Sequence, residues 1–235
     1  GRPETQGLSE TIIGTWMKAR GNRQRMVVAT KITGPSAGLK YIRGGDLRFG
    51  KKQVSDAVDL SLKRLQTDYI DLYQTHWPER PANYFGRLDY QHVEDTDFTP
   101  MEQQLDAFGE QIKAGKIRAL GVSNETPWGL MTFLEIAGRT GLPRVASIQN
   151  PYSLICRTFE VGLSEVAIRE DCGLLAYSPL AFGALSGKYL GGKDPEGSRH
   201  ALFPEFGRYF KPDAVKATEK YVKLARDHGL NAAGM

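Results

Sequence analysis

The segment Tyr69-Ile-Asp-Leu-Tyr-Gln-Thr-His76 decides the fold, because it is a short apolar run that ends on a polar side chain able to take part in catalysis, His76. Four further runs have the same form, at residues 26–31, 117–124, 145–150 and 174–178, and helical stretches lie between them. Strands of a parallel βα-barrel are buried along their length and carry functional groups at their carboxyl ends. We therefore predict an α/β enzyme whose polar strand ends gather around one mouth: Lys31, His76, Asn124, Gln149 and Tyr177.

Helical periodicity and stop residues mark the segments between the predicted strands. Helices are predicted over 8–17 with Gly21 as a stop, over 54–65, from Pro100 to Gly115, from Thr126 to Gly141, over about 159–171 and over about 213–228. The irregular segments 33–50, 77–98 and 181–212 are predicted to be loops. Strand–helix units that recur every 30 to 45 residues or so are the size of βαβ units and indicate a right-handed parallel sheet.

One helix start carries a local signature. Thr99-Pro100-Met101-Glu102 has the form of a capping box, with a hydroxyl N-cap, a proline at the first helical position and a glutamate at the third. We expect Thr99 to cap the helix that follows.

Composition restricts the class of protein. The length of 235 residues is enough for one α/β domain, and a content of 40% hydrophobic and 25% charged residues is typical of a globular protein. The net charge of +4 comes from scattered basic residues, so a nucleic-acid partner is not expected. No apolar run approaches the roughly 20 residues of a membrane helix, and no signal peptide is evident. Cys156 and Cys172 match neither a metal-binding spacing nor a disulfide framework, so we expect no metal and a reducing, cytoplasmic setting.

The strand count suggests that the chain is incomplete. Five parallel strands cannot close an eight-stranded barrel, and an open sheet would expose two bare edges. Three further strands need roughly 100 more residues. We therefore expect both ends to be cut, and an internal fragment that carries about five of the eight strands in one partial domain over 1–235.

Several long motifs resemble the aldo-keto reductase superfamily, in its bacterial Tas-like, NADP(H)-dependent branch. They are Leu62-Lys-Arg-Leu-Gln-Thr-Asp-Tyr-Ile-Asp-Leu-Tyr-Gln-Thr-His-Trp-Pro78, Gly115-Lys-Ile-Arg-Ala-Leu-Gly-Val-Ser-Asn124, Ser147-Ile-Gln-Asn-Pro-Tyr152, Phe159-Glu-Val-Gly-Leu163, Ala176-Tyr-Ser-Pro-Leu180 and Leu185-Ser-Gly-Lys-Tyr189. The resemblance spans essentially the whole chain. It implies a (β/α)₈ barrel that reduces aldehydes and ketones with NADPH.

The resemblance also implies roles for particular residues. Lys31 and His76 match two members of a catalytic Asp–Tyr–Lys–His tetrad. Ser123, Asn124 and Gln149 match residues that hold the nicotinamide carboxamide, Tyr177 matches the aromatic that stacks on its ring, and Ser178, Leu180 and Lys188 lie in the segment around the pyrophosphate. The family's Asp and Tyr would lie upstream of Gly1, so the chain as given is expected to hold half of the tetrad.

The chemistry of carbonyl reduction fits these residue types. A carbonyl that receives a hydride must also receive a proton, and a tyrosine of pKa about 10 needs a nearby ammonium to supply one near neutral pH. Lys31 is placed to be that ammonium, and His76 to orient the carbonyl or assist proton transfer. Trp77 and the 77–98 loop are expected to line the pocket of a small-molecule carbonyl substrate.

Other interpretations stay open. Lys31 and His76 could be structural strand ends, Ser123, Asn124 and Gln149 could serve only turn hydrogen bonds, and Tyr177 could be a core aromatic. The segment Gly183-Ala-Leu-Ser-Gly-Lys188 fails the Walker pattern, and no G-x-G-x-x-G motif is present. Asp68 and Asp71 are interpreted as structural. A cofactor-binding regulatory subunit of the same fold, like the channel β-subunits, or an inactive or unfolded fragment are alternatives, and the oligomeric state is not predicted.

Overall fold

The computed structural model describes residues 2–94 and 97–235, and it contains one five-stranded parallel sheet. The strands are β1 (Ala29–Ile32), β2 (Ile70–Thr75), β3 (Ile117–Ser123), β4 (Val145–Gln149) and β5 (Gly173–Leu174), and their order in the sheet is their order in the chain. Each pairs in parallel with the next. The predicted alternation of strands and helices is confirmed.

The helices follow the predicted segments, except that the helix predicted over about 159–171 is shorter and one short helix, α6, lies in the 181–212 segment predicted to be a loop. They are α1 (Leu8–Arg20), α2 (Lys51–Leu65), α3 (Met101–Lys113), α4 (Pro127–Thr140), α5 (Leu163–Arg169), α6 (Arg199–Leu202) and α7 (Pro212–Asp227). Short 3₁₀ helices lie at Pro3–Thr5, Arg23–Arg25, Ala37–Leu39, Arg43–Gly45, Thr158–Glu160, Ala181–Ser186, Leu190–Gly192 and Gly207–Tyr209. Gly21 and Gly141 end α1 and α4 in the left-handed conformation that glycine adopts without a steric cost.

The chain divides into two compact units. The first comprises the residues up to Gln149 together with Glu165–Leu174, and the second comprises Asn150–Ser164 and Leu175–Met235. The whole sheet belongs to the first unit. The single domain over 1–235 stays a prediction.

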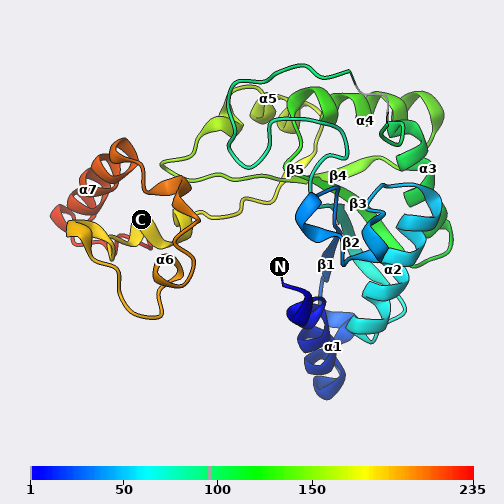
Figure 1. Ribbon diagram of the computed structural model, residues 1–235, viewed down its shortest axis with the longest axis horizontal. Helices are drawn as coiled ribbons and strands as arrows, with labels where there is room; N and C mark the ends of the chain where they lie inside the picture. The colour runs from blue at the N-terminus through cyan, green and yellow to red at the C-terminus, as the bar shows by residue number, and fades with distance from the viewer. Residues whose placement is uncertain (1, 95–96) are drawn as a thin grey trace. The chain divides into compact units, whose positions relative to one another are not determined.

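In the first unit, one face of the sheet packs against helices. Figure 1 shows α2, α3 and α4 following one another along the sheet. Tyr73 of β2 is fully buried against Phe108 of α3, with ring centroids 6.4 Å apart, and Phe108 also contacts Phe49. Leu105 of α3 is buried in the same layer. Alternate residues of each strand therefore face a helical layer, which leaves the other alternate set for the site.

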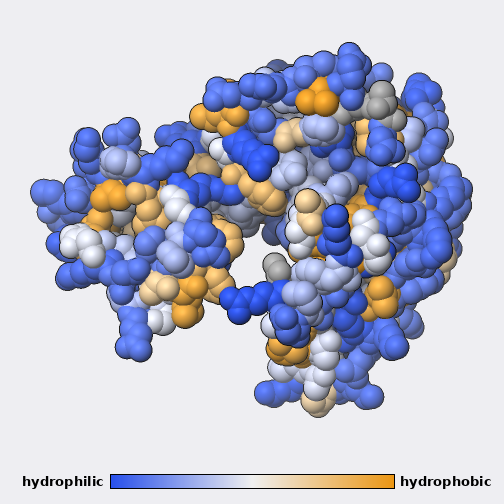
Figure 2. Space-filling model, in the orientation of Figure 1, coloured by the Kyte–Doolittle hydropathy of each residue, from blue (hydrophilic) through white to orange (hydrophobic). Residues whose placement is uncertain are grey.

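The packing of α1 differs from its apolar pattern. Leu8, Ile12 and Trp16 are 49%, 59% and 44% exposed, and Figure 2 shows hydrophobic side chains over this helix. The helix instead contacts α2 through Gly14, where a Cβ would lie 2.5–2.6 Å from backbone atoms of Arg64 and Leu65. The helical period predicted the helix correctly, but the buried face is the one that allows this close backbone approach.

The predicted capping box at Thr99 is wrong. Helix α3 begins after Pro100, and no side chain caps it. The N–H of Thr99 donates instead to Glu79 Oε1 at 2.7 Å. The Thr126-Pro127 start is confirmed, because the Thr126 hydroxyl accepts the Gly129 N–H at 3.2 Å.

The predicted strand over 174–178 is also wrong for most of its length. β5 ends at Leu174, and beyond it Tyr177 makes only an isolated bridge to Pro151. The Tyr177 N–H donates to Asn150 O at 3.1 Å, and both residues belong to the second unit. The bridge keeps the register of the β4–β5 ladder, because Pro151 and Tyr177 are as far apart in sequence as Ser147 and Gly173, but the pairing is interrupted between Leu174 and Tyr177.

The second unit is built around a small core of its own. Ala181, Ala184, Leu185 and Tyr209 are buried together, and Phe182 packs edge-on against Tyr209 with centroids 4.9 Å apart. The unit contains α6 and α7, and the predicted last helix is confirmed.

At the amino end of β2, Asp71 connects three segments. It accepts the Val28 N–H at 3.0 Å and pairs with Arg23 at 2.8 Å and Arg118 at 2.9 Å. Both guanidinium groups also lie over the Tyr69 ring, 3.8 and 3.9 Å from its centroid. The structural interpretation of Asp71 is confirmed.

We predict that Asp71→Asn lowers the free energy of unfolding by about 2–4 kcal/mol, because it removes the charge from two ion pairs. Burial opposes the Asp71 charge, but the bonds from Val28 and Arg23 leave its pKa below the ordinary carboxyl value. The contribution is therefore present above the unfolded pKa and disappears as pH falls through the lower folded pKa. Urea titrations at neutral and acidic pH measure it, with the exposed Asp68→Asn as a control; equal losses in the two variants would contradict the role of Asp71.

A second prediction compares two helical glycines. Gly14→Ala places a Cβ against the backbone of Arg64 and Leu65 and should cost about 1–3 kcal/mol. Gly138→Ala, in α4, meets nothing within 4 Å and should stabilise the fold by about 0.5–1 kcal/mol. Thermal unfolding of both variants tests the contact, and a shift of the same sign in both would exclude it.

Candidate functional site

The face of the sheet that points away from Tyr73 carries the predicted site residues in register. Lys31 of β1 pairs with Gln74 of β2, Gln74 pairs with Gly121 of β3, and Gly121 pairs with Ser147 of β4. Register partners in a sheet project to the same face. Ser123 and Gln149 form the next row toward the carboxyl ends.

Lys31 and His76 line one cavity of about 610 Å³ in the first unit. His76 directly follows β2, and its N–H donates to Ile32 O at 2.9 Å, which extends the strand ladder by one step. Burial lowers the pKa of the Lys31 ammonium. The structure therefore brings the two predicted catalytic side chains to the same space.

His76 is held as a neutral imidazole. Burial, followed by the positive charge of Lys31, lowers its pKa to about 4. Its ring lies 4.6 Å from the ring of Trp77, which also lines the cavity and donates from Nε1 to Pro35 O at 2.9 Å. A neutral imidazole offers one donor and one acceptor, so His76 is suited to hydrogen-bond an uncharged oxygen.

Asn124 connects the ends of three strands. Its Nδ2 donates to His76 O at 2.8 Å and to Ser123 Oγ at 3.1 Å, and its backbone N–H donates to Gln149 O at 2.9 Å. The Ser123 hydroxyl donates to the same Gln149 carbonyl at 2.8 Å. Asn124 adopts a left-handed φ of 55°, which asparagine tolerates better than most residues. The three residues predicted to hold the carboxamide are thus adjacent.

The other predicted cofactor residues lie in the second unit. Tyr177 is partly buried, which raises the pKa of its hydroxyl, and Ser178 has a left-handed φ of 56°. Beyond Leu180, the chain keeps positive φ through Ala181, Phe182 and Gly183. The Lys188 side chain passes over Gly183, where a Cβ would lie 3.0 Å from its Cε. This tight turn exposes Leu180 partly and directs Lys188 back across it.

A buried ion pair that sequence reasoning missed supports the loops at the strand ends. Arg80 and Glu125 form two hydrogen bonds, of 2.6 and 3.1 Å, and Arg80 also donates to Thr126 Oγ1 at 3.0 Å. Gly129 allows this pair, because a Cβ there would lie within 2.3 Å of both side chains. Glu125 directly follows Asn124, and Arg80 lies four residues after His76. The sequence signal that could have indicated this ion pair was therefore the presence of opposite charges just past two strand ends.

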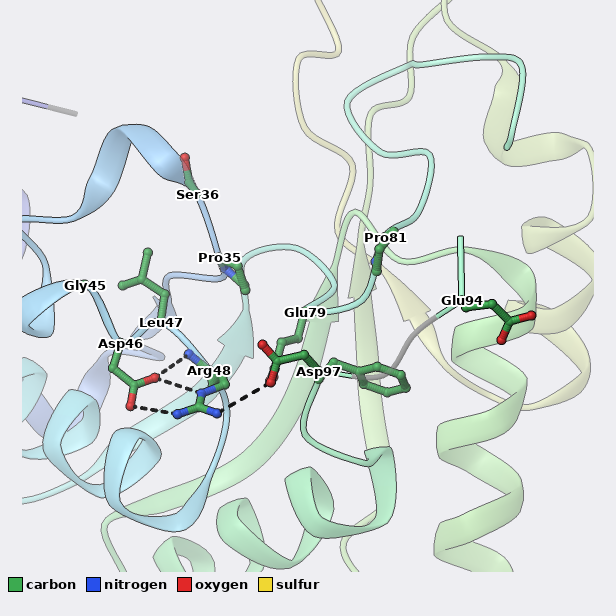
Figure 3. A pocket seen from close by; sticks show the side chains of 11 residues that line it. Pro35, Ser36, Gly45, Asp46, Leu47, Arg48, Glu79, Pro81, Glu94 and Asp97 are labelled. Carbon is green, nitrogen blue, oxygen red and sulfur yellow. Dashed lines mark hydrogen bonds and ion pairs between the residues drawn. The ribbon is translucent and has the colours of Figure 1, made fainter. Parts of the chain in front are cut away.

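A second cavity, of about 690 Å³, lies beside the loop after β1 (Figure 3). Glu79 lines it and accepts the N–H groups of Phe49 and Thr99, each at 2.7 Å. Burial raises the pKa of Glu79 despite these bonds. Arg48 pairs with Asp46 at 3.1 Å and lies 4.0 Å from Asp97. Because the hydrogen bonds of Glu79 join two loops, we interpret this carboxylate as structural.

The side chains and helices also bear on two other classes of site, a metal centre and a membrane span. Within residues 2–94 and 97–235, no group of three or more His, Cys, Asp or Glu side chains could hold a metal ion. Over the same residues, no helix has the length and apolar character that crossing a membrane demands. Cys156 and Cys172 are both free thiols.

The sequence profile of the Aldo/keto reductase family matches residues 5–235. The chain belongs to the aldo/keto reductase family. The fold of this family is a (β/α)₈ barrel, and the five parallel strands with alternating helices are a part of it, as predicted. Members are oxidoreductases, so the resemblance given by the motifs is confirmed.

Curated relatives agree with the family. Protein tas of Escherichia coli K12 is 49% identical over 234 residues, which is 100% of this chain and 68% of that protein. An aldo-keto reductase of Babesia bovis is 41% identical over 216 residues, covering 87% and 76% of the two chains. Aldo-keto reductase yakc [NADP(+)] of Schizosaccharomyces pombe is 30% identical over 223 residues, covering 94% and 58%.

The state of His76 gives a prediction for this aldo/keto reductase. Its ring should be neutral at pH 7 and should protonate with a midpoint of about 4. In Lys31→Met the midpoint should rise, because one neighbouring positive charge is gone, but should stay below 6.5, because burial remains. An NMR titration of the imidazole carbons measures both values. A midpoint near 6.5 in the unaltered protein would contradict the buried, neutral ring.

Proposed function

We propose that this protein reduces aldehydes or ketones to alcohols by hydride transfer from NADPH. The observation that carries the proposal is the pair Lys31 and His76, two desolvated nitrogen side chains on neighbouring strands that line one cavity. A neutral hydrogen-bond donor beside an ammonium suits a reaction in which charge develops on a carbonyl oxygen.

The residues present fit the cofactor. Gln149 Oε1 is buried and has no hydrogen-bond partner among the described residues, so it can accept from the amide of a nicotinamide. We assign Ser123, Asn124 and Gln149 to the carboxamide, Tyr177 to ring stacking, and Ser178, Leu180 and Lys188 to the pyrophosphate. NADPH, when bound, supplies the hydride. The preference for NADP(H) is supported by the name of the Schizosaccharomyces pombe relative, aldo-keto reductase yakc [NADP(+)].

Lys31 is assigned to proton supply. A free tyrosine has a pKa of about 10, and a cation within about 4–6 Å favours its phenolate. We propose that the acid is a tyrosine encoded before residue 1, with an aspartate beside Lys31, as the resemblance implies. Lys31 is partly buried, and the reduced contact of its ammonium with water strengthens its effect on the acid.

His76 is assigned to orientation of the substrate. With a pKa of about 4, the His76 ring is neutral at pH 7, so it cannot act as an acid in its imidazolium form. Its ring N–H can instead donate to the carbonyl oxygen of the substrate. Asn124 Nδ2 donates to His76 O and so holds the His76 backbone in place. This favours orientation over proton transfer, the two roles left open by the sequence.

The substrate is proposed to be a small molecule that binds against Trp77. Trp77 is in edge contact with Phe85, at 5.7 Å between centroids, and its ring stacks with Tyr84 at 6.4 Å. We propose no nucleic-acid or membrane partner, and we place the reaction in the cytoplasm, where free thiols stay reduced.

The test is NADPH oxidation by the full-length protein over a panel of aldehydes and ketones. Lys31→Met should lower kcat by about 10²–10⁴-fold with little change in NADPH affinity, because the residue acts on the proton and not on cofactor binding. The exposed Lys18→Met serves as the charge-matched control and should retain activity. Tight NADPH binding without turnover over the whole panel would reject the enzymatic proposal and favour a cofactor-binding subunit.

A further inference from the structure

Three polar side chains on the face that carries Lys31 contain buried atoms with no hydrogen-bond partner among residues 2–94 and 97–235. They are both amide atoms of Gln74, Oγ of Ser147 and Oε1 of Gln149. Gln74 is fully buried, and Ser147 is nearly so. Proteins seldom leave such atoms unpaired, so a group of them on one surface requires an explanation.

The two deeper side chains are neighbours across a glycine. Gln74 of β2 and Ser147 of β4 are both register partners of Gly121. A Cβ at Gly121 would lie 2.7 Å from Ser147 Oγ and 3.0 Å from Gln74 Cγ, so both side chains lean over the same backbone position. Gln149 lies two residues beyond Ser147 on β4 and therefore projects to the same face.

The unpaired atoms determine which kind of ligand could bind among them. Gln74 and Gln149 offer carbonyl oxygens as acceptors, while the Gln74 amide nitrogen and the Ser147 hydroxyl can donate. None of these groups is charged, so they match a neutral group that both donates and accepts. Water is the smallest such group, and buried waters typically make two to four hydrogen bonds to protein atoms that are otherwise unpaired.

We propose that Gln74, Ser147 and Gln149 form an internal water site on the sheet face that carries Lys31. Through this water, Gln74 acts as a positioning residue for the Gln149 amide. A water that donates to one lone pair of Gln149 Oε1 fixes the orientation of that amide and leaves the second lone pair of the same oxygen to accept from the nicotinamide carboxamide. The cofactor part of this inference rests on the proposed function, whereas the water site does not.

The sign of a stability change tests whether the site is occupied. If a water pairs these atoms, Ser147→Ala and Gln74→Leu each remove hydrogen bonds and should lower Tm by about 2–4 °C. If the atoms are unpaired, removal of a buried polar group relieves its desolvation cost, and Tm should stay constant or rise. Melting of the full-length protein without cofactor measures both. A decrease in both variants supports the site, and an unchanged or higher Tm in either one overturns it.

Ser147→Ala removes a single oxygen atom, so it decides the question if Gln74→Leu does not fold. A double-mutant cycle adds a second measure: the two losses should be less than additive, because both variants act on the same water. Additive losses would overturn the shared site.

The positioning role is tested by the affinity for NADPH, measured by quenching of protein fluorescence. Gln74→Leu should weaken binding by about 2–10-fold, the loss of one hydrogen bond acting on Gln149. Gln111→Leu is the matched control, since Gln111 is a buried glutamine on α3 whose Oε1 also has no partner among the described residues. Equal Kd values in the two variants would overturn the positioning role. If the unaltered protein does not bind NADPH, the proposed function fails, while the melting experiment still judges the water site.

Discussion

The candidate site depends on the hydrogen bonds of one residue, Asn124. Its side chain donates to the backbone of His76, and its main chain donates to the backbone of Gln149. The ladder stops at Thr75, Ser123 and Gln149, and the other bonds past it, from the His76 N–H and the Ser123 hydroxyl, each join only two neighbouring strands. Asn124 adds bonds just past that limit and keeps three strands in step where the chemistry is proposed. The left-handed backbone of Asn124 is a part of this arrangement, since it turns the side chain back across the sheet.

Much of the fold could be predicted from the sequence because the signals were local. Strands β1 to β4 and helices α2, α4 and α7 follow from apolar runs, Gly stops and the Thr126-Pro127 start. The failures each involve a distant partner. Glu79, twenty residues away, takes the Thr99 N–H that Glu102 accepts in a capping box, and it also bonds the Thr99 side chain, so Thr99 does not cap α3. The buried face of α1 is set by how closely Gly14 approaches α2. The strand predicted to reach Ser178 is interrupted after Leu174, and no periodicity within the segment indicates that only Tyr177 bonds again to the chain after β4.

The site was predictable to a smaller extent. Polar residues at strand ends identified Lys31, His76, Asn124 and Gln149, and the structure places these four on the sheet of the first unit. Gln74 was missed because a single polar residue inside an apolar run is indistinguishable from a tolerated exception. Only the register, which aligns it with Lys31 and Gly121, shows that it belongs to the same surface. The Arg80–Glu125 pair was missed for a different reason: both residues follow strand ends, but 45 residues separate them in the sequence.

The division of the chain has a consequence for biosynthesis. The first unit ends at Gln149 and resumes at Glu165, so the residues between these points belong to the second unit. As the chain leaves the ribosome from its amino end, residues 150–164 emerge before β5 exists, and their partners from Leu175 onward emerge after it. The first unit is therefore complete in sequence once Leu174 has emerged, whereas residues 150–164 of the second unit must wait for the residues from Leu175 onward. A pause in translation near residue 164 would expose an unfinished sheet edge at β4, the form of chain most prone to misassociate.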